Sequence, residues 1–447
     1  MDRIPPEILL HIFEFLDGTA PSQARLHDQP RDDMLNAEDQ LSLGLKPVSL
    51  VCKVWRVLVL PSLFRHILWK PKMSSLRAFT LNPIPLLRFL EDNKLDRTVT
   101  TFTLVVDFVD KEADARHITP EIRTVDLEWL WDQLFSVIDP LRFTIIAPPT
   151  TLAAFMSRML FLDDAWSFSI PYHILSLARP TRGSLRGKSS GYHIETHLSD
   201  LHVSTPEHSH ARAYQSSTAA ASSSSTSSSN RYRKPPACPL FTVRPWTSLL
   251  LNEGSSIRVY RTYEFFLRRP PSMLGALLGC EEYPNDTLLI PPTITDFNYI
   301  AIFPLSSHVE TLLRHLPKLN RLFLQLTPSP GNPILQDEEE MKHIDPADLW
   351  MERNTAYSSL MRELTLDTDH PGNWATLRIF ESGDAADKEA WQMAVRVMER
   401  SDVDNWKVER EGVFVKVDED GNTPGVEQDV DGHTGATISH EGQLLGR

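Results

Sequence analysis

The sequence predicts a mixed chain, of α+β or α/β class, in which a small all-helical N-terminal module precedes a larger, irregular α/β body. Three observations carry this prediction. Apolar residues recur at helical spacing near the N-terminus, helix, proline and strand patterns follow one another further along, and two polar stretches interrupt the chain. At 447 residues the chain exceeds what one hydrophobic core usually organises, so a small module with a larger body fits its length.

The two polar stretches set the expected boundaries. Residues 201–236 are rich in Ser, His, Ala and Arg, and residues 418–447 form an acidic tail rich in Gly, Asp and Thr. Neither holds enough apolar surface to offset the entropy of ordering, so both are predicted to be disordered. The remaining chain then divides into the helical module at 1–70, a first part of the body at 71–200 and a second part at 237–417.

The first helix of the module is expected to begin near residue 6. Pro5 and Pro6 suit a first helical turn, and the acidic Glu7 favours the positive end of the helix dipole. Asp17 and Gly18 end the pattern. The apolar residues that share one side of this helix are Ile8, Leu9, Ile12, Phe13 and Leu16.

A second helix is expected from about Pro47 until Pro61 ends it. Its apolar face comprises Val48, Val51, Cys52, Trp55 and Leu58, and the apolar residues Leu63, Phe64, Ile67 and Trp69 follow. Two short amphipathic helices bury little surface alone, so this stripe indicates a partner. On periodicity alone, the alternative is an ordinary helical pair docked on the chain's own body.

The residues of this module resemble the F-box family in order and kind. The resemblance runs through Ile4-Pro5-Pro6-Glu7-Ile8-Leu9, Ile12-Phe13, Phe15-Leu16, Val48-Ser49-Leu50-Val51-Cys52-Lys53, Trp55-Arg56 and Pro61-Ser62-Leu63-Phe64. It implies binding to a Skp-type adaptor, which joins F-box proteins to a cullin and a ubiquitin-charged conjugating enzyme. The adaptor-binding residues that it implies here are Pro5, Ile8, Leu9, Ile12, Leu16, Val48, Cys52 and Trp55.

One segment departs from the family pattern. Residues 17–45 form a polar, acidic insertion where the family usually has a short connection, and only Leu41, Leu43 and Leu45 suggest an apolar pattern. The entropy of loop closure grows slowly with length, by about 0.6 kcal/mol per doubling, so the fold tolerates such an insertion. We expect it to lie near the adaptor-binding surface.

The body is interpreted as irregular leucine-rich-repeat-like units, with an ordinary mixed α/β domain as the alternative. The strand of such a repeat needs apolar residues at offsets zero, three and five. Five segments comply: Val99-Phe102-Leu104, Ile138-Leu141-Phe143, Ile294-Phe297-Tyr299, Leu319-Leu322-Leu324 and Met361-Leu364-Leu366. The context is more informative, because helical faces ending before Pro140 and Pro317 precede the Phe143 and Leu319 strands.

Composition and motifs argue against several functions. A net charge of -14 gives no support for nucleic-acid binding, and no apolar run is long enough for a membrane span. Three scattered cysteines and an N-terminus without signal-peptide character favour a reducing, cytoplasmic and/or nuclear location. We expect no cofactor, metal or catalytic residue, and we interpret five histidines, His193, His197, His202, His208 and His210, as part of a solvated tract.

Three hypotheses for function remain. The leading one is a non-catalytic substrate-receptor subunit of a Skp/cullin/F-box ubiquitin ligase, acting by proximity on a target that the sequence does not identify. The second is an F-box scaffold without ubiquitin transfer, and the third is an enzyme with an unrecognised site. For the first, we expect the target to bind between Phe241 and Val417. Aromatic and arginine side chains of the kind that anchor interfaces there are Arg258, Tyr260, Tyr263, Arg321 and Phe323.

Overall fold

A computed structural model supplies the fold. It describes residues 4–17, 19–30, 34, 44–71, 73–75, 78–79, 81–106, 124–160, 167–168, 172–182, 238–268, 272–282, 285–365, 373–401 and 406–417. The two stretches predicted to be disordered, 201–236 and 418–447, lie outside the described residues, as do the five histidines of the expected solvated tract.

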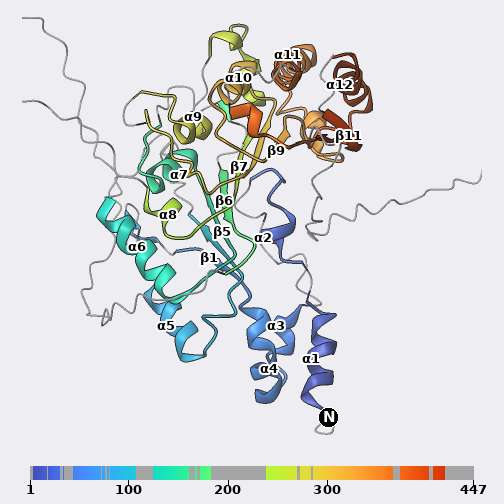
Figure 1. The fold of residues 1–447 in the computed structure, drawn as a ribbon. Coiled ribbons are helices and arrows are strands. Elements are labelled where there is room, and N and C mark those ends of the chain that lie inside the picture. Colours follow the sequence, from blue (N-terminus) through green and yellow to red (C-terminus); the bar gives the residue numbers. More distant parts are fainter. Residues whose placement is uncertain are drawn as a thin grey trace, which may run out of the picture.

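A ten-stranded mixed sheet forms the body (Figure 1). Along the sheet, its strands are β1 (His66–Trp69), β4 (Thr101–Val105), β5 (Arg142–Ala147), β6 (His173–Ala178), β7 (Ser248–Ser255), β8 (Asp296–Ile302), β9 (Arg321–Gln325), β10 (Ile379–Ser382), β12 (Val413–Lys416) and β11 (Trp406–Arg410). The first eight therefore lie side by side in chain order. A separate pair, β2 (Met73–Ser75) and β3 (Ala78–Phe79), is antiparallel.

Most strands run in one direction. β1, β4 and β5 are parallel, and so are β7, β8, β9 and β10. β6 is antiparallel to both of its neighbours, so the two parallel groups share one direction. β12 pairs antiparallel with β10 and with β11. The sheet thus has a starting edge, where the parallel strands begin, and an ending edge, where they finish.

Helices occupy the connections. The module contains α1 (Pro6–Glu14), α2 (Pro21–Ala24), α3 (Leu45–Val48) and α4 (Lys53–Leu63), and the body contains α5 (Ile84–Asp92), α6 (Thr124–Val137), α7 (Pro149–Phe155), α8 (Pro239–Thr242), α9 (Met273–Leu278), α10 (Ser306–His315), α11 (Pro346–Thr365) and α12 (Lys388–Arg400). Short 3-10 turns are η4 (Ile257–Arg261), η5 (Phe265–Leu267), η6 (Pro333–Gln336) and η7 (Asn373–Thr376).

The main core lies between the body helices and one face of the sheet. Alternate strand residues such as Phe102, Phe143 and Tyr299 point into it, because side chains of a strand alternate between faces. Helices from α5 to α12 contribute their apolar stripes, including Leu130 of α6 and Leu312 of α10. The stacked rings of Phe102 and Phe143, with centroids 5.7 Å apart, join neighbouring strands within this core.

The opposite face of the sheet carries a second core. Its strand residues include Ile146, Leu250 and Ile300, which alternate with those of the main core. Segments from the ending edge cover them, among them Tyr260 of η4 and Leu349 of α11. The sheet is therefore buried on both faces over its central strands.

Part of the predicted insertion completes this second core. Residues 19–30 and 34, which we call the strap, pack on the sheet, with Leu26 and Met34 buried in the second core. Buried Asn252 of β7 donates hydrogen bonds to the carbonyl oxygens of Leu26 and Asp28, at 3.0 and 2.8 Å. The His27 ring lies 4.8 Å from that of Phe323 in β9. The expectation that the insertion lies near the adaptor-binding surface is wrong for this segment, which reaches the body instead.

Several predicted elements are confirmed and others are corrected. The helix and strand on either side of Pro317 are α10 and β9, and those around Pro140 are α6 and β5. The helix expected from Pro47 is interrupted, because residues 49–52 form a turn between α3 and α4. The strand expected at Met361-Leu364-Leu366 is wrong, since Met361 and Leu364 are buried residues of α11.

Candidate protein interaction site

The N-terminal module has a small core of its own. Leu9 and Phe13 of α1 pack with Leu45 of α3 and Val59 of α4, and all four side chains are buried. The Phe13 ring meets Trp55 edge to face, with centroids 5.3 Å apart. Helices α1, α3 and α4 lie together at one end of the molecule (Figure 1). Such a core holds the helices in place, but it is too small to cover both sides of α4.

Local sequence explains how the helices begin and end. The Pro5 carbonyl accepts hydrogen bonds from the Ile8 and Leu9 amides, at 3.1 and 3.2 Å, which starts α1 at Pro6. Cys52 caps α4, because its sulfur accepts a hydrogen bond from the Trp55 amide at 3.4 Å. In the preceding turn, the Ser49 hydroxyl donates to the Lys46 carbonyl at 2.7 Å.

The module exposes large apolar side chains along α1, along α4 and in the turn before α4. Phe15 is 82% exposed and Leu50 is 74% exposed. More than half of each of six such side chains is open to solvent: Ile8, Phe15, Leu50, Val51, Val54 and Val57. Ile8 and Phe15 lie seven residues apart on one side of α1, whereas Val54 and Val57 share one side of α4. Large apolar side chains left exposed in this number mark a surface that another protein covers.

Comparison with family models gives the decisive observation. An F-box-like model matches residues 1–69, the stretch that contains the helices and the exposed apolar residues. The chain carries an F-box-like domain. The resemblance that the sequence suggested is thereby confirmed. Comparison with curated proteins and with solved structures found no significant match.

The structure separates the predicted adaptor-binding residues of the F-box-like domain into three groups. Leu9 is buried in the domain core, where it supports the packing of the helices. The half-buried residues, which pack on that core, are Leu16, Val48 and Trp55. The exposed residues are Pro5, Ile8, Ile12 and Cys52.

Five of the six exposed apolar residues were not among the predicted adaptor-binding residues, although Val51 was expected on the apolar face of the second helix: Phe15, Leu50, Val51, Val54 and Val57. For Val54 and Val57, a signal exists in the composition of α4. This helix is apolar nearly all round, and such a helix is buried on all sides in the assembled state. Because its own domain covers only one side, the apolar residues on the other side predict a partner.

The F-box-like domain continues directly into the sheet. α4 ends at Leu63 and β1 begins at His66, whose Nδ1 lies 2.8 Å from the Thr101 hydroxyl of β4. Arg65 forms an ion pair with Asp17 at the end of the first helical segment. Burial and the neighbouring Arg65 lower the pKa of His66, so the neutral imidazole is favoured at this joint.

Two buried carboxylates in the body are accounted for by the fold. Glu253 accepts hydrogen bonds from the Ser272 hydroxyl, the Met273 amide and the Tyr299 hydroxyl, at 2.8, 2.5 and 2.6 Å. Asp384 accepts from the amide and hydroxyl of Thr327 at 2.8 and 2.7 Å. Burial raises the pKa of both acids. The carboxylate oxygens of both acids already accept hydrogen bonds from the chain itself, so the two acids stabilise the fold.

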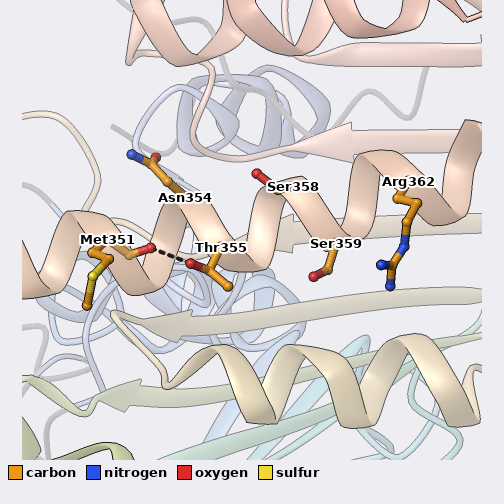
Figure 2. A pocket seen from close by; sticks show the side chains of 6 residues that line it. All are labelled: Met351, Asn354, Thr355, Ser358, Ser359 and Arg362. Atoms are coloured by element: carbon orange, nitrogen blue, oxygen red, sulfur yellow. Dashed lines mark hydrogen bonds between the residues drawn. The ribbon is translucent and has the colours of Figure 1, made fainter.

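An open pocket on the body lies along α11 (Figure 2). Its lining comes from one side of that helix: Met351, Asn354, Thr355, Ser358, Ser359 and Arg362. The Thr355 hydroxyl donates back to the Met351 carbonyl at 2.9 Å, a local bond within the helix. This lining does not combine a nucleophile with a base, so the pocket offers no catalytic arrangement.

Two kinds of site are absent from the described part of the chain. Among these residues, no three His, Cys, Asp or Glu side chains are grouped so that they could hold a metal ion. No helix within the same residues has the length and apolarity needed to cross a bilayer.

Proposed function

We propose that this protein is the substrate-receptor subunit of a Skp/cullin/F-box ubiquitin ligase. One observation carries the proposal: the F-box-like domain exposes apolar residues, from Ile8 on α1 to Val57 on α4, that its own core leaves uncovered. F-box domains generally bind Skp-type adaptors, and an adaptor covering this surface would bury the exposed side of α4.

In this proposal the protein positions its target, and other components of the ligase catalyse ubiquitin transfer. The F-box-like domain binds the adaptor and, through it, a cullin, while the body binds a target protein. Holding a target lysine near a charged conjugating enzyme raises its effective concentration, which is catalysis by proximity. The chain is then a non-catalytic subunit that works in the cytoplasm, the nucleus or both.

The body is proposed to be a degenerate leucine-rich-repeat-like array. Strands β1, β4, β5 and β7 to β10 run in one direction, and helices lie in the connections on one face. Each repeat of such an array contacts only its neighbours, as these strands do. The reversed strand β6 and the covered second face are where this body departs from a regular array.

Titration calorimetry with a purified Skp-type adaptor tests the proposal. The double variant Leu50→Glu, Val54→Glu places charges on the exposed side of the 50–57 segment, where neither side chain supports the fold. Burying unpaired charges at an interface costs several kcal/mol, so affinity should fall by at least about a hundredfold. Met393→Glu is the matched control, since Met393 is an equally exposed apolar residue on α12.

The control variant should bind the adaptor as the wild type does. Equal adaptor affinity of the double variant and the wild type, with both proteins folded, would reject the assigned surface. A reconstituted ubiquitination assay then separates the receptor from an F-box scaffold. Recovery of adaptor without cullin, and without ubiquitin transfer to a bound target, would favour the scaffold.

A further inference from the structure

A second exposed apolar group lies on the loop that follows β7. Tyr263 is 92% exposed, and Phe266 and Leu267 of η5 are more than 60% exposed. These three residues lie within a span of five, and we call them the apolar triad. Large apolar side chains that are this exposed and this close together are unusual on a monomer, whereas aromatic residues often anchor protein interfaces.

The loop that carries the triad is anchored firmly. Phe265, between the exposed residues, is buried, and its ring lies 4.9 Å from that of Tyr260. The Tyr260 hydroxyl donates to the Pro304 carbonyl at 3.2 Å, so η4 is tied to the segment after β8. A group presented on an anchored loop loses little conformational entropy on binding, which is what a binding surface needs.

Acidic residues lie within the triad segment, at Glu264, and on the turn at 337–340, which is bonded to the preceding η4. Arg258 donates to both carboxylate oxygens of Glu340, at 3.0 and 2.6 Å, and Arg261 donates to the Glu340 carbonyl at 2.9 Å. The bond from Arg258 lowers the pKa of Glu340 and keeps that carboxylate ionised. These bonds join η4 to the turn at 337–340 and engage the two arginines of η4. The exposed carboxylates around the joint are Glu264, Asp337, Glu338 and Glu339.

We propose that the apolar triad and this acidic turn form the target-docking surface, and that they fit a basic segment with a bulky apolar or aromatic anchor. The inference rests on the proposed receptor function and names the class of target. The anchor would pack on Tyr263 and Phe266, while lysine or arginine side chains beside it would face the carboxylates and the aromatic rings. An acidic segment would meet like charges here.

The place of this surface in the fold suits a receptor. The F-box-like domain precedes β1 at the starting edge of the sheet, whereas the triad follows β7 at the ending edge. A target on the triad therefore leaves the adaptor surface open. Of the five anchors expected from sequence, Tyr263 lies at this surface. Tyr260 and Phe323 are buried, and Arg258 and Arg321 form ion pairs with Glu340 and Glu381.

Fluorescence anisotropy with labelled synthetic peptides tests the surface on the full chain. The first peptide flanks a central Trp-Leu pair with lysines and arginines, the second replaces those basic residues with glutamates, and the third replaces Trp-Leu with Ala-Ala. We expect the first peptide to bind at least about tenfold more tightly than either of the others. Equal binding of the three peptides, or binding of none, would overturn the proposal.

Two double variants locate the binding. Tyr263→Ala with Phe266→Ala should weaken the first peptide by more than about tenfold, because it removes both rings. Glu338→Lys with Glu339→Lys should shift preference toward the glutamate peptide. The matched control, Met393→Ala with Val397→Ala, removes two exposed apolar side chains of α12 and should change neither result. Unchanged peptide binding by the triad variant would place the site elsewhere.

Adaptor binding distinguishes the two proposals. The triad variant should bind the Skp-type adaptor as the wild type does, since its changes lie at the other edge of the sheet. A chain that binds the basic peptide but no adaptor would retain the docking surface and lose the receptor assignment. A chain that binds the adaptor but no peptide would retain the receptor assignment and lose the docking surface.

Discussion

Asn252 of β7 is expected to control whether the strap stays on the body. Its side-chain nitrogen donates to the Leu26 and Asp28 carbonyls, and its oxygen accepts from the Gly254 amide at 3.0 Å. Asn252→Ala removes all three bonds and leaves their partners unpaired in a buried site. The strap's other contacts with the body include the buried side chains of Leu26 and Met34 and the ring of His27 on Phe323, so the strap is the segment that this change should release first.

The size of the effect follows from those bonds. A hydrogen bond contributes roughly 1 kcal/mol net, so the two bonds to the strap stabilise its docking by about 2 kcal/mol. Their loss should raise the open population of the strap roughly thirtyfold. The third bond lies within β7, and its loss adds about 1 kcal/mol to the destabilisation of the whole fold.

Amide hydrogen exchange followed by mass spectrometry reads out this opening. Peptides covering residues 19–30 should exchange faster in Asn252→Ala, while those from α10 and β9 change less. Asn93→Ala is the matched control, because Asn93 is exposed and its amide donates a single bond to the Phe89 carbonyl at 2.8 Å. Unaltered exchange across residues 19–30 in a folded Asn252→Ala protein would refute the reasoning.

Two further predictions concern the stability of the body. Burial lowers the pKa of His173 in the folded protein to about 3. Between that pH and the ordinary pKa of histidine, the imidazole is protonated only in the unfolded state, so the free energy of unfolding falls as the pH falls. Urea unfolding should show that His173→Leu removes about 2 kcal/mol of the stability difference between pH 6.5 and pH 5, and an identical pH dependence in both proteins would contradict this. Gly279 ends α9 with φ +69°, and an added Cβ would lie 2.2 Å from the Thr287 carbonyl carbon. Gly279→Ala should therefore cost more than about 2 kcal/mol in thermal unfolding, whereas Gly331→Ala, also at positive φ but in open space, should cost about 1 kcal/mol, and equal losses would be inconsistent with the steric argument.

The elements of the body were predicted well where an apolar pattern and a proline break agreed. The apolar stripe from Val309 to Leu316 reads as a helix, Pro317 ends it, and the strand β9 follows. The spacing of Met361, Leu364 and Leu366 failed because apolar residues three apart also share one side of a helix. In α11 that side faces the main core, so Met361 and Leu364 are buried without a strand.

The site was predictable as a module but not residue by residue. Apolar periodicity identifies a helix face, but it does not say whether the chain or a partner covers that face. Leu9 and Ile8 are neighbours of similar apolarity, yet one is buried and the other is half exposed. The strap escaped prediction for another reason. Leu26 is isolated among polar residues, and the long-range bond from Asn252 to its carbonyl leaves no local pattern in the sequence.

The reversed strand β6 decides where the long Ser-rich part of the chain is attached. β6 ends at Ala178, which pairs with Ser248 at the beginning of β7, so the chain leaves and re-enters the body between adjacent strands. The Arg182 side chain donates to the Val99 carbonyl at 2.8 Å and holds the exit beside the start of β4. The end of β6 and the beginning of β7 thus lie together at the starting edge of the sheet, the edge at which the F-box-like domain precedes β1. A change in the length of this connection would therefore leave β6 and β7 paired and the two halves of the sheet joined.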